Sequence, residues 1–127
     1  MMNLDCINDA AISYHLPAIL IIAVLKTENG KIGAVTQNKN KTYDIGPMAI
    51  NSSWLPELKK YGVTQQDIQY DMCVNIKMGA FILSKKIANR TDLAIGIGDY
   101  HSHSVTLNTV YYQKVKLNLS QITLLLN

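Results

Sequence analysis

Apolar residues recur at three- to four-residue spacing along most of this chain, which predicts a mainly helical protein. The clearest pattern covers residues 72–88, where charged residues fall outside a single apolar stripe. Shorter helices are predicted around residues 4–14, 17–28, 54–61, 92–100 and 108–117. The stripe of the long helix consists of Met72, Ile76, Gly79, Ala80, Leu83 and Ile87.

Two stretches depart from the helical pattern. Residues 31–43 are mostly polar, and the region around 31–50 is predicted to form an exposed loop or a small β-hairpin. The leucine-rich end, Ile122 to Leu126, either packs onto the core or belongs to a tail over 118–127. The predicted fold is a compact multi-helix domain with a small hairpin region.

The helix over 17–28 is unusually apolar and ends in a carboxylate. Pro17 suits its first turn, and Asn29-Gly30 suits its end. Glu28 would then lie in the last turn, beside the negative end of the helix dipole and close to the core, which predicts a raised pKa. Such an acid can serve as a general acid near neutral pH. The alternative is an ordinary exposed glutamate at a frayed helix end.

Composition narrows the classes of function. The chain has 127 residues, 48% of them hydrophobic and 17% charged, which is typical of one globular domain. The net charge of +3 comes from scattered lysines, so nucleic-acid binding is not indicated, although an anionic polymer would suit it. The apolar run from Leu16 to Leu25 is too short for a membrane span. No secretion signal is recognisable, so a leader has been removed or export is not used.

Four short segments occur in an informative order: Glu28–Gly30, Asp44–Asn51, Cys73–Ala80 and Gly98–Ser102. Together they resemble the lysozyme superfamily, and within it the small lytic transglycosylases of secretion, conjugation and pilus machines. The resemblance covers roughly residues 4–115. It implies a mainly α, lysozyme-like fold and a single transglycosylase domain over 1–127, with a core at about 4–117.

The resemblance assigns roles to particular residues. Glu28 matches the catalytic acid, and Tyr100 matches a tyrosine whose hydroxyl can bind and orient that carboxyl. Asp44 is the candidate second carboxylate, with a structural turn residue as the alternative. In the 73–80 segment, an asparagine and Gly79-Ala80 are expected to pack behind the active site. The implied substrate-binding residues are Asn29, Gly46, Met48, Ala49, Ile50, Asn51, His101 and Ser102.

Three positions depart from the family pattern. Asn29 replaces a serine that usually follows the catalytic glutamate, and an asparagine can still donate a hydrogen bond. Pro47 replaces a leucine, and Ala49 replaces a glutamine that usually offers a polar contact. The loss of this glutamine bears on substrate affinity.

The implied reaction cleaves the β-1,4 bond between N-acetylmuramic acid and N-acetylglucosamine in peptidoglycan and leaves a 1,6-anhydro end. One acid/base residue suffices for it, whereas hydrolysis usually needs a second carboxylate. The alternatives are therefore a hydrolytic lysozyme that uses Glu28 and Asp44, or a catalytically weak peptidoglycan-binding or assembly domain. No cofactor is implied. His101 and His103 have no evident third partner for a metal ion.

The resemblance also implies a location and partners. A cell-envelope or periplasmic protein is expected, acting on glycan strands beside an envelope-spanning secretion or conjugation machine, as a monomer without a membrane span. In that oxidising compartment Cys6 and Cys73 would pair and tie the first helix to the helix over 72–88. Two buried free thiols in a cytosolic protein are the alternative. Trp54 is expected either to stack on a sugar or to anchor the core.

Overall fold

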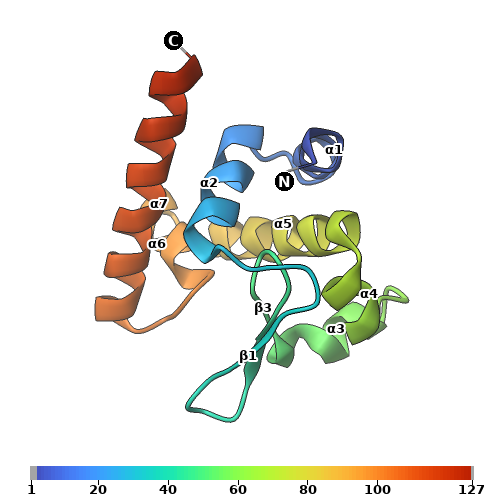
Figure 1. Ribbon diagram of the computed structural model, residues 1–127. Helices are drawn as coiled ribbons and strands as arrows, with labels where there is room; N and C mark the ends of the chain where they lie inside the picture. The colour runs from blue at the N-terminus through green and yellow to red at the C-terminus, as the bar shows by residue number, and fades with distance from the viewer. Residues whose placement is uncertain (1–2, 127) are drawn as a thin grey trace.

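The structure, a computed structural model, describes residues 3–126. In that range seven α-helices and one small antiparallel sheet form a mainly helical domain, as predicted. The central element is α5 (Met72–Ala88), around which the other helices pack (Figure 1). Four residues of its apolar stripe are buried, and the two at its ends, Met72 and Ile87, are partly buried and pack on the core, so the periodicity of the sequence located the core correctly.

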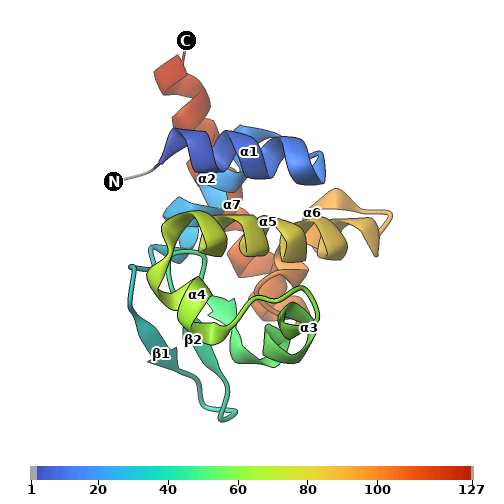
Figure 2. The same cartoon turned by 90° about the vertical axis from the view of Figure 1, so that its right-hand side faces the viewer.

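The first two helices cover the upper side of α5. Helix α1 (Leu4–Tyr14) lies along α5, and α2 (Ala18–Glu28) descends beside α7 (Figures 1 and 2). His15 adopts a left-handed conformation that ends α1, and Pro17 begins the next helix. Because α2 is apolar on nearly every side, it can be buried between α1 and α7 and can carry its last residue into the interior.

The hairpin region contains three short strands, β1 (Val35–Gln37), β2 (Tyr43–Ile45) and β3 (Ile50–Asn51), in that order across the sheet. Thr36 pairs with Asp44, and Asp44 also pairs with Asn51. The β1–β2 hairpin projects from the helical body (Figure 2). The sheet is followed by a 3-10 turn, η1 (Ser52–Trp54), and by α3 (Leu55–Lys59) and α4 (Gln65–Tyr70).

The last two helices form a corner. Helix α6 (Leu93–Asp99) is followed by α7 (Val105–Leu126), which begins earlier and ends later than the predicted helix over 108–117. The predicted tail is therefore helical up to residue 126, while residue 127 lies outside the described range. Ile122 is only 7% exposed and joins the core, which decides between the two interpretations of the leucine-rich end.

No single helix within residues 3–126 is both long and apolar enough to cross a membrane. Helices α1 and α2 reach the required length only when taken together, and they are bent by 119°.

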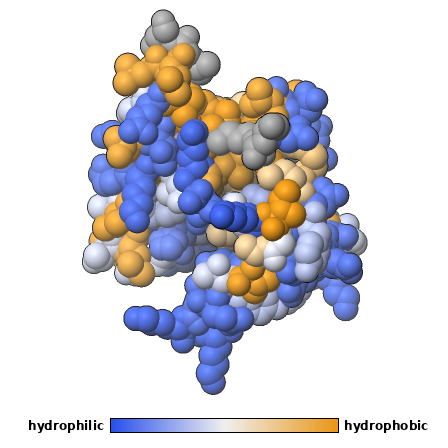
Figure 3. Space-filling view, viewed as in Figure 1, coloured by the Kyte–Doolittle hydropathy of each residue, from blue (hydrophilic) through white to orange (hydrophobic). Residues whose placement is uncertain are grey.

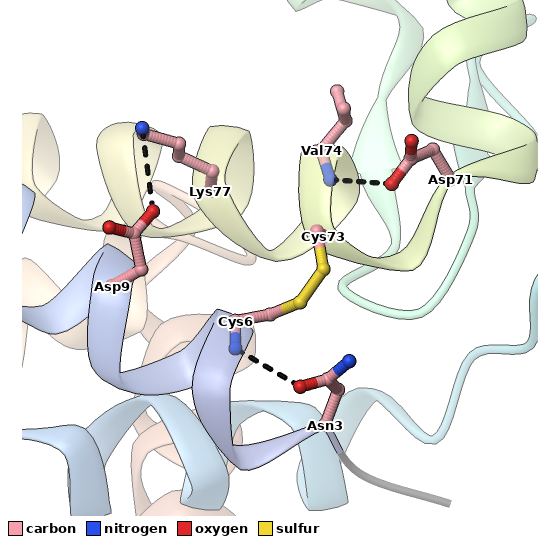
Figure 4. The surroundings of a disulfide bond; sticks show 7 residues. All are labelled: Asn3, Cys6, Asp9, Asp71, Cys73, Val74 and Lys77. Carbon is pink, nitrogen blue, oxygen red and sulfur yellow. Dashed lines mark hydrogen bonds and ion pairs between the residues drawn. A yellow bond between two sulfur atoms is a disulfide. The ribbon is translucent and has the colours of Figure 1, made fainter.

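A disulfide joins α1 to the beginning of α5. Cys6 and Cys73 are bonded with their Cα atoms 5.1 Å apart, as the sequence analysis expected for an oxidising compartment (Figure 4). One turn further along, Lys77 forms an ion pair of 3.5 Å with Asp9, but both side chains are exposed, so this pair contributes little. The disulfide is the stronger link between the two helices.

Replacing both cysteines (Cys6→Ala with Cys73→Ala) is expected to lower the free energy of unfolding by about 3–4 kcal/mol, because the unfolded chain loses a long closed loop. Urea unfolding of the oxidised proteins measures this difference. A reducing agent should bring the wild type down to the stability of the double variant and leave the variant unchanged. Equal stability of the oxidised wild type and the variant would contradict the prediction.

Candidate functional site

A groove of about 530 Å³ opens between the β1–β2 hairpin and the corner of α6 and α7. In the space-filling view the surface is hollowed between the hydrophilic hairpin and this corner (Figure 3). Residues from the end of α2, the sheet with its turns, η1, α5, α6, the α6–α7 loop and α7 line it. They are Glu28, Asn38, Lys39, Asn40, Thr42, Asp44, Ala49, Asn51, Ser53, Trp54, Lys86, Asp99, Tyr100, His101, Ser102, His103 and Leu107.

Glu28 is the last residue of α2, and its neighbours fix its place in the groove. Asn29 ends the helix in a left-handed conformation with φ of 52°. The next residue, Gly30, lies against the carbonyl oxygens of Gly46 and Pro47, where any side chain would collide with backbone. Glycine at position 30 therefore allows the end of α2 to lie directly against the turn that follows β2.

The far side of the α2 terminus is held by α7. Asn118 donates a hydrogen bond of 2.9 Å to the Thr27 hydroxyl, which itself donates to the carbonyl of Ala23 at 2.7 Å. Val115 on α7 is fully buried. The part of α7 beyond the predicted helix end thus helps to position the residue that precedes Glu28.

The pKa of Glu28 is raised from 4.5 to about 7, and burial is the largest cause. The nearby Tyr111 hydroxyl opposes this rise, the negative charge of Asp44 adds to it, and the positive charge of Lys114 opposes it. The prediction of a raised pKa is confirmed, with burial as its main cause. Near neutral pH this carboxyl can both give and accept a proton.

Two tyrosines flank Glu28, and their roles differ from the prediction. The Tyr100 hydroxyl donates a hydrogen bond of 2.7 Å to the Met48 carbonyl, so the predicted hydrogen bond to Glu28 is wrong. Tyr111 lies next to Glu28 instead. Its hydroxyl is buried and forms no hydrogen bond of regular geometry with any described residue, although it acts on the pKa of Glu28. Tyr111 is therefore the nearer partner of the carboxyl.

Asp44 lines the groove and is held in a network of amides. The side-chain amides of Asn38 and Asn51 both donate to its Oδ1, each at 3.1 Å. The same two amides also donate to the Thr42 hydroxyl, at 3.1 and 3.0 Å. Asp44 thus has a structural role in the hairpin, and its charge also acts on Glu28.

The segment over 44–51 contributes fewer groove residues than predicted. Met48 is 0% exposed and Ile50 is 1% exposed, so both side chains belong to the core and neither residue lines the groove; that they bind substrate stays a prediction. Gly46 is buried in a turn with φ of 71°, and Asn29 ends α2 outside the groove. Among the predicted binding residues of the two segments, only Ala49 and Asn51 line the groove.

Helix α5 supports this turn from behind. The Asn75 amide donates to the Ile45 and Ile68 carbonyls at 3.0 and 2.8 Å, and its oxygen accepts from the Met48 backbone at 2.8 Å. Gly79 leaves room for the Met48 side chain. The packing of an asparagine and a glycine behind the site is therefore as the resemblance implied.

The predicted residues after α6 line the groove. His101 stacks on Tyr111, with ring centroids 5.0 Å apart and 7° between the planes, and Ser102 lies beside it. Within residues 3–126 no group of three metal-ligating side chains comes together.

Several groove residues were not assigned to the site from the sequence. Lys86 and Asp99 come from α5 and α6, and Trp54, which was left between two roles, lines the groove and also packs on the core. Lys86 lies on the polar side of its helix, where nothing in the sequence distinguishes it from solvent-exposed lysines. Tyr111 lies within the predicted helix over 108–117, and the sequence analysis assigned it no role in the site.

Sequence comparisons find several curated relatives. The chain is 33% identical over 81 residues to "Invasion protein IagB" of Salmonella typhimurium, which covers 63% of this chain and 51% of that protein. It is 35% identical over 88 residues to "Peptidoglycan-binding-like protein" of Escherichia coli O157:H7, covering 63% and 53%. It is 30% identical over 81 residues to "X polypeptide" of Escherichia coli strain K12, covering 63% and 48%.

The chain thus spans about half the length of the curated relatives it matches. No protein-family model matches it. These similarities support a relationship with a peptidoglycan-related family of proteins.

Glu28→Gln is expected to stabilise the protein at high pH only. A carboxyl with its pKa raised from 4.5 to about 7 destabilises the fold progressively as pH rises through that interval, because the folded state holds the proton more tightly. The variant should be about 3 kcal/mol more stable than the wild type at pH 8 and equally stable at pH 4. Urea unfolding at both pH values measures this. A difference in stability between Glu28→Gln and the wild type that is the same at both pH values would contradict the prediction.

Tyr111→Phe is expected to destabilise the protein by about 1 kcal/mol at pH 8, where Glu28 is ionised and loses a hydroxyl that favours its anion. At pH 4 the variant should be at least as stable as the wild type, because the removed hydroxyl is buried without a regular partner. Thermal unfolding compares the two conditions, with Tyr112→Phe as the matched control. An equal effect at both pH values would show that the hydroxyl does not act on Glu28.

Proposed function

We propose that this protein is a peptidoglycan lytic transglycosylase that cleaves the bond between N-acetylmuramic acid and N-acetylglucosamine with a 1,6-anhydro product. The observation that carries the proposal is a carboxyl with a pKa of about 7 that opens on a groove of about 530 Å³. Such a volume suits sugar-sized ligands. The relative named "Peptidoglycan-binding-like protein" supports peptidoglycan as the polymer.

In the proposed reaction Glu28 first acts as an acid. Its proton passes to the oxygen of the glycosidic bond as that bond breaks through an oxocarbenium-like state. The carboxylate that remains then accepts the proton of the muramoyl 6-hydroxyl, whose oxygen attacks the anomeric carbon. A pKa near 7 serves both steps, since the proton is held before cleavage and can be taken up again afterwards.

The groups around Glu28 have supporting roles in this proposal. The negative charge of Asp44 favours the positive charge that develops on the sugar, and it also helps to keep Glu28 protonated. The Tyr111 hydroxyl favours the carboxylate in the second step. Tyr100 holds the turn at Met48 and so shapes the groove.

A hydrolytic lysozyme is the second candidate. Asp44 lines the same groove as Glu28, and its charge reaches that carboxyl, so it could direct a water molecule or stabilise the intermediate. The two amides that hold Asp44 favour the structural role, because they occupy one of its oxygens. The two reactions leave different glycan ends and can be separated by their products.

The setting of the protein is also a proposal. We place the single domain in the periplasm or envelope, where it opens the wall locally for a secretion or conjugation apparatus. A disulfide suits an oxidising compartment, and the relatives include a protein named for invasion.

Incubation with purified sacculi, followed by mass spectrometry of the soluble muropeptides, tests the proposed function. The wild type should release 1,6-anhydro ends, at a rate that falls about tenfold per pH unit above pH 7 as Glu28 loses its proton. Glu28→Gln should reduce the release by at least about a hundredfold, which is the usual contribution of a general acid.

Asp44→Asn is the companion variant. For a transglycosylase it should reduce the rate without changing the anhydro product. Reducing ends that disappear in Asp44→Asn would instead identify a hydrolase. Binding to sacculi without any soluble product, unchanged in Glu28→Gln, would contradict catalysis and favour a binding domain.

A further inference from the structure

One wall of the groove carries Lys86, whose side chain belongs to a network of hydrogen bonds and ion pairs. We call this part the Lys86 corner and define it by Trp54, Lys86, Asp99 and His103, all of which line the groove. They come from η1, the end of α5, the end of α6 and the α6–α7 loop. The proposed mechanism uses none of them.

The network begins at a buried carboxylate. The Asp99 side chain is 1% exposed and accepts a hydrogen bond of 2.7 Å from Arg90 Nε and one of 2.9 Å from the Asn108 amide. Burial alone would raise the pKa of Asp99, but Arg90, His103 and Lys86 lower it below its ordinary value. Asp99 is therefore ionised at neutral pH and holds the other residues of the network.

His103 and Lys86 extend this network to the surface of the groove. His103 Nδ1 lies 3.4 Å from Asp99 Oδ1, and Lys86 Nζ lies 2.9 Å from His103 Nε2. An ammonium group can only donate, so His103 Nε2 is the acceptor and its Nδ1 carries the proton that faces Asp99. The lysine head is held by one of its three N–H groups.

Together with Arg90, the corner carries a net positive charge. Arg90 balances the charge of Asp99, which leaves the charge of Lys86 facing the groove. Within residues 3–126 no carboxylate lies within ion-pair distance of Lys86 Nζ. The ammonium also lies 5.5 Å from the centre of the Trp54 ring. A fixed ammonium beside an indole suits a sugar that bears an anionic group.

On the basis of the proposed function, we propose that the Lys86 corner binds a carboxylate on the muramic acid residues of the glycan and so selects acidic strands over neutral ones. The two sources of this group in peptidoglycan are the lactyl carboxylate itself and the carboxylates of an attached peptide. The middle of the groove is less suited to this role, because the negative charge of Asp44 would repel a carboxylate there. Lys39 is exposed on the hairpin, and no side-chain hydrogen bond within the described residues holds its ammonium as His103 holds that of Lys86, so it offers no comparable fixed site.

Equilibrium binding of three soluble strands to Glu28→Gln protein, which avoids turnover, tests this proposal. The strands are chitotetraose, a peptide-free oligomer of alternating N-acetylglucosamine and N-acetylmuramic acid, and the same oligomer with its peptides. Adding Lys86→Gln should weaken binding of a carboxylate-bearing strand about fivefold at low salt, the upper end for a partly exposed ion pair, and leave chitotetraose within twofold. Lys86→Arg should retain the preference.

The matched control is Lys116→Gln, which removes the same charge from the exposed side of α7 and should change none of the three affinities. A loss with the peptide-free oligomer identifies the lactyl carboxylate, whereas a loss confined to the peptide-bearing strand identifies the peptide, and both support the corner. An equal loss of affinity for all three strands, or no loss, overturns the proposed role of the Lys86 corner, while the proposed function stands. If the Glu28→Gln protein binds none of the strands, the proposed function fails together with the corner.

Discussion

The candidate site depends on the burial of one carboxyl group, that of Glu28, which still lines the groove. Helix α2 achieves this because it is apolar on nearly all sides and carries Glu28 at its end into the interior. Gly30 then allows the turn after β2 to approach, and Asn118 on α7 binds Thr27 from the other side. Burial raises the pKa of Glu28 to about 7, which gives the site its acid.

The remaining charges of the groove are arranged around this carboxyl. Asp44 is fixed by two amides of the hairpin, and its charge favours the protonated form of Glu28. On another wall, the buried Asp99 fixes His103 and, through it, the ammonium of Lys86. The sheet therefore supplies a negative group near the proposed reaction, and the α5–α6 side supplies a positive one. Both the proposed reaction at Glu28 and the proposed carboxylate binding at the Lys86 corner depend on this separation of charge across the groove.

Local patterns in the sequence were sufficient to predict six of the seven α-helices within residues 3–126, the hairpin region and the raised pKa of Glu28, whereas α4 was not predicted as a helix. The end of α2 at Asn29-Gly30 and the apolar stripe along α5 can both be recognised from residues that are close together in the sequence. Contacts between distant elements were not predictable in this way. Met48 and Ile50 were expected in the groove because the segment that contains them lines it, but Ile45–Met48 and Ile50 are buried, and Asp44, Ala49 and Asn51 are the residues of that segment that reach the groove.

Local patterns in the sequence also failed to predict that Tyr111 and Lys86 belong to the site. Both lie on helices whose faces can be identified only once α7 and α5 are packed, so no local signal distinguishes them from neighbouring tyrosines and lysines. The predicted end of α7, at residue 117, was too early. Ile122 and Asn118 nevertheless pack against the rest of the domain and continue the helix.

The central claim is that Glu28 keeps its proton at neutral pH. The most direct measurement is a titration of its side-chain carboxyl carbon by NMR in protein labelled at glutamate, with Glu28→Gln to distinguish its signal from that of Glu57, the other glutamate of the chain. The account predicts a midpoint near pH 7 for Glu28. A midpoint near 4.5, the ordinary value for a solvated glutamate, would contradict it.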